Sequence, residues 1–215
     1  MENLIVILFL CAAVPMIPAL NLLPDKRSKL FLGYMLLGLS VCLISAEVNS
    51  LLLDLFGGDM RYVNTNITPI AEELLKSLPI LFFALAVSDD RDTLISISYS
   101  LGLGFAILEN LVILTVYVES VTIPWALVRG FGAAWMHSAC TTMVGLGISY
   151  VRKRRKLFYC GTFSLLIAAV IAHAIYNTLI QSQYRWVAYA VVILMYVPHI
   201  IKYVRRFQAK SARKD

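Results

Sequence analysis

Charged residues are scarce in this sequence. They make up 15% of its 215 residues, whereas an average soluble domain has about 25%. Hydrophobic residues make up 60%, against about 45–50% in soluble domains. A soluble domain of this length cannot bury so many apolar side chains, because much of its chain still faces water. The composition therefore predicts a multi-span integral membrane protein. It excludes a soluble enzyme with an anchor, a secreted disulfide scaffold and a disordered tail protein.

Several short motifs of catalysis and metal binding are also absent. The sequence contains no HExxH motif, which leaves a standard zincin site without support, and neither a GxSxG elbow nor a Walker loop occurs. The four cysteines lie in separate apolar stretches and form no CxxC pair. We interpret them as small residues of the helix interior rather than as a disulfide or metal site. They are Cys11, Cys42, Cys140 and Cys160.

Long apolar runs are what the sequence has instead. Runs of about 20 residues are long enough to cross a bilayer, and they predict an all-α, polytopic membrane bundle with about seven transmembrane helices. The approximate spans are 4–23, 29–53, 67–88, 93–118, 125–151, 158–180 and 186–201. No linker or repeat divides the chain, so we expect one domain over residues 1–215. The first run is longer than a signal peptide's apolar region and has no basic residue before it, and Pro15 and Pro18 are expected to kink it.

Basic residues are unevenly distributed among the loops. Lys and Arg concentrate in residues 25–29, 152–156 and the tail after Ile201, whereas the loops 54–66, 119–124 and 181–185 hold only Arg61 and Arg185. The positive-inside rule then predicts an external N-terminus and a cytoplasmic C-terminus in a multi-pass protein of the cell membrane. The same rule explains the net charge of +6 without a nucleic-acid partner.

Charged side chains within membrane spans are costly and indicate functional sites by default. Six of them fall within the predicted helices, together with two histidines and three amides. These residues are Glu47, Glu72, Glu73, Lys76, Glu109, Arg129, His137, His173, Asn49, Asn110 and Asn177. Lys76 follows Glu72 by four residues and Glu73 by three, so it can neutralise a carboxylate on its own helix. His173 and Asn177 are also four residues apart and share one helix face.

The depth of these groups points to one shared cavity. At 1.5 Å per residue, Glu73 lies roughly 9 Å from the outer end of its predicted helix and His173 about 10 Å. Glu109 lies about 14 Å and His137 about 20 Å from the outer ends of theirs. Odd and even helices run in opposite directions, so this agreement is independent of the order in the chain. We expect a polar cavity that opens to the outside.

Other polar residues fit supporting roles better. Glu47 and Asn49 match the depth of the cavity and are expected to line it or to pair with Arg129. His199 lies near the cytoplasmic end of the last predicted helix and is interpreted as an interfacial residue.

The residue types in this cavity are compatible with two hydrolytic mechanisms. A carboxylate beside an imidazole can activate water as a general base, while His173 and Asn177 donate hydrogen bonds to a developing oxyanion. Glutamate and histidine can equally hold Zn²⁺ with one position open for water. The candidate ligands for such a metal are Glu73, Glu109, His137 and His173. The residues leave both alternatives open, with either no cofactor or a single zinc-type ion.

Four motifs in order resemble the PrsW family of membrane-embedded peptidases, which is related to CAAX prenyl endopeptidases and bacteriocin-processing proteins. Each motif is weak alone, but four in order, each within a predicted span, are specific, and they cover about residues 67–180. They are EExxK at 72–76, FxxxEN at 105–110, Arg129 followed by His137, and HxxxN at 173–177.

This resemblance implies an endopeptidase that makes the first, extracytoplasmic cut in a single-span membrane protein of the anti-sigma-factor type. Its partners would be that substrate and the lipid bilayer. The assigned catalytic residues are Glu72, Glu73, Lys76, Glu109, His137, His173 and Asn177, with Asn110 and Arg129 in support. Glu73 is favoured over Glu72 as the base. The family often has Asp where this chain has Asn177, which favours an amide donor there over a metal ligand.

A proton-coupled transporter is the alternative, because buried Glu, His, Lys and Arg also form proton relays. No inverted repeat of the kind seen in many transporters is evident, and the polar groups share one depth rather than following a path. A retinal-type receptor would need a lysine inside the last helix, whereas Lys202 lies at its end.

Overall fold

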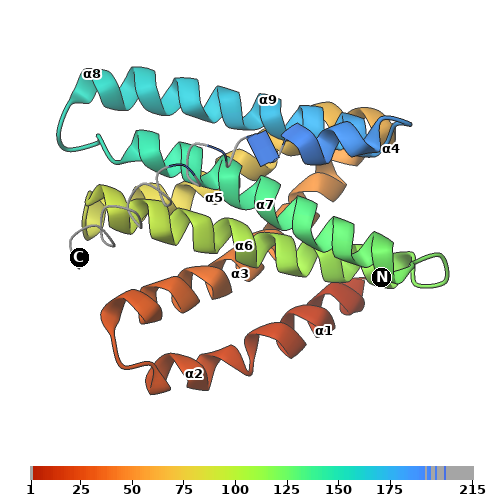
Figure 1. Cartoon of the computed structure of the whole chain (residues 1–215), viewed down its shortest axis with the longest axis horizontal. Helices are drawn as coiled ribbons and strands as arrows, with labels where there is room; N and C mark the ends of the chain where they lie inside the picture. Colours follow the sequence, from red (N-terminus) through yellow and green to blue (C-terminus); the bar gives the residue numbers. More distant parts are fainter. Residues whose placement is uncertain (1, 192, 195–196, 198–200, 202–215) are drawn as a thin grey trace, which may run out of the picture.

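The computed structural model describes residues 2–191, 193–194, 197 and 201. Within these residues the regular secondary structure is entirely helical, which confirms the predicted all-α class. The long helices lie side by side, roughly along one direction (Figure 1). They are α1 (Glu2–Ala13), α2 (Met16–Leu22), α3 (Lys26–Leu55), α5 (Thr68–Ala86), α6 (Arg91–Val116), α7 (Ile123–Ile148) and α9 (Phe163–Ile180). The short elements are α4 (Met60–Tyr62), α8 (Arg155–Leu157) and the π-helical turns η1 (Val63–Ile67) and η2 (Phe158–Thr162).

Four helical stretches of the described chain are long and apolar enough to cross a membrane. They are Leu4–Leu22, Lys26–Leu55, Arg91–Val116 and Arg155–Ile180, and each coincides with a predicted span. Helices α5 and α7 coincide with two further predicted spans, but α5 carries three charged residues and α7 carries Arg129 and His137. The seventh predicted span is helical at 185–191, while much of its remainder, with His199, lies outside the described residues. Seven spans and their orientation therefore stay predictions.

The expected kink in the first span is present at Pro15. Helix α1 ends at Ala13 and α2 begins at Met16, with Pro15 between them. Proline lacks the N–H that would continue the helical hydrogen bonds. Pro18 lies in the first turn of α2, where a missing N–H costs little, so it does not interrupt the helix.

Helix α6 lies between α3 and α7 and approaches both closely (Figure 1). A Cβ atom on Gly104 would overlap the backbone carbonyl of Met35 in α3, and one on Gly102 would lie 2.6 Å from the carbonyl oxygen of His137 in α7. Small residues allow such close helix packing in membranes. The contact at Gly102 brings α6 directly against the turn of α7 that carries His137.

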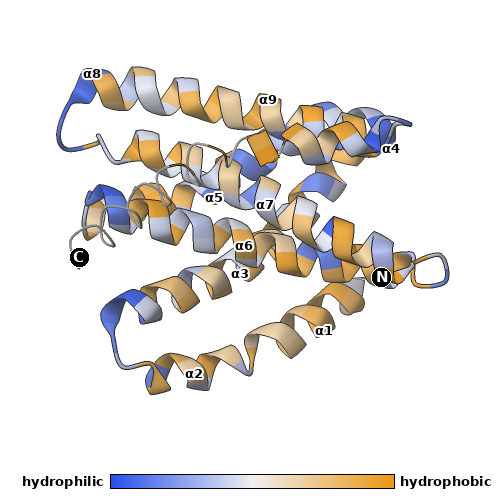
Figure 2. Cartoon of the chain, viewed as in Figure 1, coloured by the Kyte–Doolittle hydropathy of each residue, from blue (hydrophilic) through white to orange (hydrophobic). Residues whose placement is uncertain are grey.

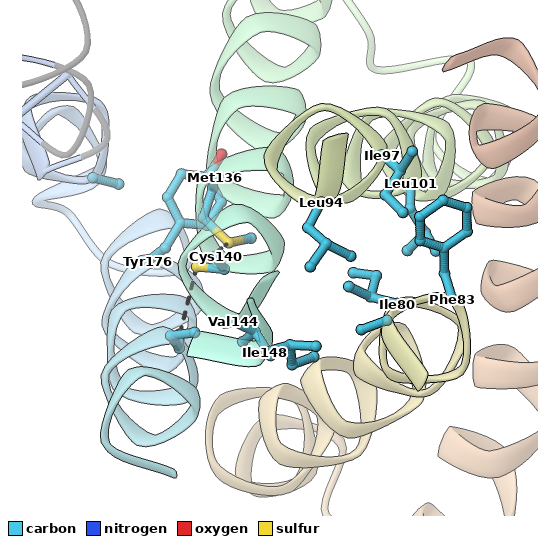
Figure 3. Close-up of a cluster of buried hydrophobic side chains, with 13 residues drawn as sticks. Ile80, Phe83, Leu94, Ile97, Leu101, Met136, Cys140, Val144, Ile148 and Tyr176 are labelled. Atoms are coloured by element: carbon cyan, nitrogen blue, oxygen red, sulfur yellow. Dashed lines mark hydrogen bonds between the residues drawn. The ribbon is translucent and has the colours of Figure 1, made fainter. Parts of the chain in front are cut away.

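An apolar core fills one half of the bundle formed by α5, α6, α7 and α9 (Figure 3). Most of its side chains come from the C-terminal halves of α5 and α7 and from the N-terminal half of α6, and Ala169 and Tyr176 of α9 join them. Ile80, Leu94, Leu101 and Cys140 are completely buried there. Because sequential helices run in opposite directions, these segments meet at the same level, and the other half of each helix meets at the opposite level.

Candidate functional site

The opposite half of the same helices brings polar side chains together. Glu72, Glu73 and Lys76 lie in the first two to three turns of α5, and the remaining groups come from the C-terminal half of α6, the middle of α7 and the C-terminal half of α9. The latter are Glu109, His137 and His173. Hydrogen bonds connect groups from all four helices, so the predicted convergence of these residues is confirmed.

The innermost part of this cluster is an ion pair that is sealed from solvent. Lys76 Nζ lies 2.6 Å from Glu73 Oε1, and both side chains have an exposed fraction of 0%. The same Glu73 oxygen lies 2.9 Å from His173 Nδ1, while Lys76 Nζ lies 4.6 Å from the centre of the Phe105 ring. Buried charges require partners of this kind. Glu73 therefore serves to neutralise Lys76 and to orient His173.

Lys76 also sets the tautomer of the second histidine, His137. Lys76 Nζ lies 3.0 Å from His137 Nδ1, and an ammonium group can only donate. Nδ1 of His137 is therefore the acceptor, and Nε2 carries the proton that it donates to Glu109 Oε2 at 3.1 Å. Arg129 Nη2 approaches the same Glu109 oxygen at 3.6 Å. His137 is thus held as a neutral imidazole of defined tautomer between two charged side chains.

Glu72 differs from Glu73 in both contacts and access. Its Oε1 accepts a hydrogen bond of 3.1 Å from Asn49 Nδ2. Its Oε2 is buried without a hydrogen-bond partner and lies 3.8 Å from His173 Nε2. That separation is too long for a direct hydrogen bond. Because Nδ1 of His173 donates to Glu73, its Nε2 has a free lone pair, so the two atoms can share a small ligand such as water.

A cavity of about 780 Å³ opens beside this pair, within the usual size range of ligand sites. Glu72 and Glu109 line it, whereas Glu73 and Lys76 do not. Further polar side chains on its wall are Asn49, Asn64, Arg129, Asn177 and Arg185. Of the two neighbouring glutamates on α5, Glu72 is therefore the one that a substrate in the cavity would meet. Glu73, which the sequence favoured as the base, does not line the cavity, and the identity of the base stays a prediction.

Not every residue expected at the cavity lies there, since His137 and His173 are buried beside it and do not line it. Asn49 lines it as expected, but Glu47 is exposed and does not belong to its wall. Arg129 pairs with Glu109 rather than with Glu47. Asn110 is buried, and its Oδ1 has no hydrogen-bond partner, but it does not line the cavity.

Asn177 lines the cavity and has a structural contact in addition. Its Nδ2 donates a hydrogen bond of 2.9 Å to the backbone carbonyl of Asn64 in η1. This contact connects α9 to the turn that precedes α5. A carboxamide nitrogen has two N–H groups, so one remains for another acceptor. The predicted oxyanion role of Asn177 stays a prediction.

Several polar groups at the cavity were not anticipated from the sequence, among them those of Arg185 and Asn64. Arg185 falls in a polar stretch that reads as a loop, and the carbonyl of Asn64 is a main-chain group. Neither carries a motif that distinguishes it, so only the packing of α9 and the turns around it could reveal them.

The residues that can share a metal ion differ from the predicted set. Ligand atoms of Glu72, His137 and His173 lie within 4.8 Å of one another. Glu72 thus takes the place of Glu73 and Glu109 in the predicted set, because those two carboxylates already hold the histidines.

This donor set fits a zinc-type ion. Two imidazoles and one carboxylate are a known ligand set of catalytic zinc, with a fourth position for water. Carboxylates hydrogen-bonded to the ligating imidazoles are typical of such sites. The cluster also has three carboxylates against the cations of Lys76 and Arg129, which leaves one excess negative charge to favour a cation. His137 would first exchange its contact with Lys76 or Glu109.

An apolar helical bundle that buries carboxylates and imidazoles beside a polar cavity defines a membrane protein with hydrolytic or proton-transfer chemistry inside the membrane. Residues 26–202 match the family described as PrsW family intramembrane metalloprotease. The chain belongs to this family and is therefore a membrane-embedded protease, as the four motifs predicted. Neither a curated protein nor a solved structure matches the chain.

Proposed function

We propose that this protein hydrolyses a peptide bond of a membrane-anchored protein in the cavity, with Glu72 as the general base. The observation that carries this proposal is the position of Glu72 Oε2. It is buried, unpaired and 3.8 Å from His173 Nε2, on a side chain that lines the cavity. A base needs access to water and substrate, which Glu72 has and Glu73 lacks.

In this mechanism Glu72 takes a proton from a water molecule that also hydrogen-bonds to His173 Nε2. The water oxygen forms a bond to the scissile carbonyl carbon, and the carbonyl oxygen becomes an oxyanion. Glu72 then returns the proton to the leaving amine as the C–N bond breaks. Glu73 holds His173 in the tautomer that accepts at Nε2, and this positioning is its role in the reaction.

The oxyanion requires donors that face the cavity. His173 has no N–H at Nε2 while Nδ1 donates to Glu73, so Asn177 is the better candidate of the predicted pair. Its second N–H is available beside the one that binds Asn64. Arg129 supplies a further cation on the cavity wall.

The family name and the donor set also support a metal-dependent form of the same reaction. Glu72, His137 and His173 would hold the ion. A zinc-type ion there supplies polarisation of the scissile carbonyl and a more acidic bound water. The substrate-facing roles of Arg129 and Asn177 are the same in both forms.

The proposed substrate is a single-span regulatory protein of the anti-sigma-factor type, cut on the extracytoplasmic side. Asn49 at the cavity follows Lys26 by 23 residues of α3, about 34 Å along the helix. This exceeds the hydrocarbon thickness of about 30 Å, so the cavity lies near the membrane surface opposite the basic turns. With those turns in the cytoplasm, the cavity faces outward. Reporters after Lys156 should then read as cytoplasmic, and reporters near Asp59 or Glu119 as external.

The test is cleavage of a single-span anti-sigma-type protein by the purified protease in proteoliposomes, with and without a chelator. Cleavage that survives the chelator supports water activation by Glu72 alone, and cleavage that is lost and then restored by Zn²⁺ supports the metal form. Protein that cleaves nothing but carries protons across the vesicle membrane would contradict the proposal and favour the transporter.

A further inference from the structure

A second recess lies on another face of the bundle and shares no residue with the cavity. It is a groove of about 740 Å³ between α3 and α5. Its walls are almost wholly apolar, with residues such as Leu37, Ile44, Leu78 and Phe82. Its polar side chains are those of Lys26, Lys29 and Tyr34, which all belong to the N-terminal part of α3. The groove is therefore amphipathic along its length, basic at one end and apolar beyond it.

The basic end of the groove lies at a surface where several charged turns meet. Arg152 donates to the carbonyl of Leu85, and Lys153 Nζ donates to the carbonyl of Asp89 at 2.7 Å. The turn before α3, the turn between α5 and α6 and the segment after α7 gather at one end of the bundle (Figure 2). Lys26 and Lys29 thus lie at an end of the bundle where basic residues outnumber the aspartates of the same turns, and they are not an isolated pair of charges.

The dimensions of the groove suit one membrane leaflet. Lys29 and Ile44 both line it and are 15 residues apart on one helix, or about 22 Å. Half of a hydrocarbon core measures about 15 Å, so the apolar part spans one leaflet with room for the headgroup region. A glycine in the wall keeps the groove open, since a Cβ on Gly33 would meet no atom within 4 Å.

We propose that this groove binds one anionic phospholipid, with an acyl chain between α3 and α5 and its phosphate at Lys26 and Lys29. Basic pockets between transmembrane helices on the cytoplasmic side bind anionic headgroups. A zwitterionic lipid such as phosphatidylcholine also has a phosphate, but its choline cation opposes the attraction of the two lysines, so it should bind more weakly. The bound lipid would brace α3 against α5, the two helices that carry Asn49 and Glu72, from outside the cavity.

The test is native mass spectrometry of the purified full chain with phosphatidylglycerol or phosphatidylcholine of identical acyl chains. Wild-type protein should retain one phosphatidylglycerol and prefer it over phosphatidylcholine at least fivefold. Lys29→Gln should weaken phosphatidylglycerol binding about fivefold, because one lysine near an anionic lipid surface contributes about 1 kcal/mol. Arg27→Gln is the matched control, since it removes the same charge from a residue that does not line the groove.

Filling the groove gives the second arm of the test. Gly33→Leu should fold, because the space above Gly33 is open, and should lose retention of phosphatidylglycerol at least tenfold. Gly161→Leu is its control, as that glycine has equally open surroundings and lies outside the groove. Equal binding of both lipids would overturn the proposal, as would full retention by Gly33→Leu. A dimer that Gly33→Leu dissociates would instead identify a second copy of the chain as the occupant. None of these readouts depends on peptidase activity.

Discussion

The two halves of α5 bury different kinds of side chain, charged in the first half and apolar in the second. In its first half the buried side chains include Glu72, Glu73 and Lys76, and in its second half they are Ile80, Phe83 and Ala84. Helices α6, α7 and α9 also contribute to a polar layer and an apolar layer, although apolar side chains such as Phe105 and Tyr176 lie among their polar groups.

The apolar layer and the polar layer therefore have different roles, one in packing the helices and the other in forming the candidate site. The apolar layer consists mainly of well-packed aliphatic side chains, although the buried hydroxyl of Tyr176 in it has no hydrogen-bond partner. The polar layer contains a desolvated ion pair, two imidazoles of defined tautomer and unpaired carboxylate oxygens on Glu72 and Glu73. Buried ion pairs seldom stabilise a protein more than apolar residues of the same size. We therefore expect the apolar layer, rather than the polar layer, to supply most of the stability of the bundle.

The largest expected effect is on activity and comes from Glu72. Glu72→Gln should lower the cleavage rate about 10²–10⁴-fold, because it removes the general base. Protein level and unfolding temperature should stay unchanged, since glutamine keeps the volume and an acceptor for Asn49. Glu47→Gln, on an exposed carboxylate of α3, is the control and should cleave normally. Near-normal cleavage by Glu72→Gln would refute its role as base.

The next largest effect is on the free energy of unfolding and tests the buried ion pair of Lys76 and Glu73. Lys76→Met leaves Glu73 charged in the interior without its cation, with only the hydrogen bond from His173, and should lower the free energy of unfolding by about 3–5 kcal/mol. The double variant Lys76→Met with Glu73→Gln should recover most of this loss, because both charges of the ion pair are then removed. Denaturant unfolding in detergent micelles measures both. A double variant as unstable as the single one would mean that the ion pair is not the cause.

A smaller loss is expected where the helices touch. Gly104→Ala should destabilise the protein by about 1–3 kcal/mol, because its new methyl group overlaps the backbone of Met35. Gly33→Ala is a matched change in the adjacent helix with open space above it, and should stabilise α3 slightly. If thermal unfolding shifts equally in both variants, close packing of α3 and α6 is not what requires Gly104.

The smallest expected effect lies outside the membrane, at the start of α6. The hydroxyl and backbone N–H of Thr93 donate to Asp90 and hold the pKa of its carboxyl below the ordinary value of 3.8. A lowered folded-state pKa gives stability that is complete above the unfolded-state value and is lost as the pH falls below it.

Asp90 is the N-cap residue of α6, and the unfolding temperature measured against pH tests the contribution of this cap. The difference between wild type and Asp90→Asn should be constant above about pH 5 and should shrink below about pH 4. Asp92→Asn removes the same charge from the first turn of α6 but leaves the cap, and should show a smaller change. A difference that persists at low pH would show that the ionised cap is not its source.

Much of this architecture could be predicted from residue patterns. Apolar runs identified the helices because a bilayer requires about 20 such residues. Depth along the predicted helices brought Glu109, His137 and His173 to one level. Which of Glu72 and Glu73 faces the cavity could not be predicted in the same way. Adjacent residues point about 100° apart on any helix, and the sequence does not fix how the helix is rotated.

By itself the amino-acid sequence determined that this protein is a helical membrane protein of the PrsW family and which helices carry its polar residues. Composition, apolar length and motif order are local properties, and they need no knowledge of helix packing. Only the tertiary structure decided that Lys76 and His173 engage Glu73 while Glu72 faces the cavity. The reason is that the rotation of α5 about its own axis is set by its contacts with α3, α7 and α9, which lie far from it in the chain.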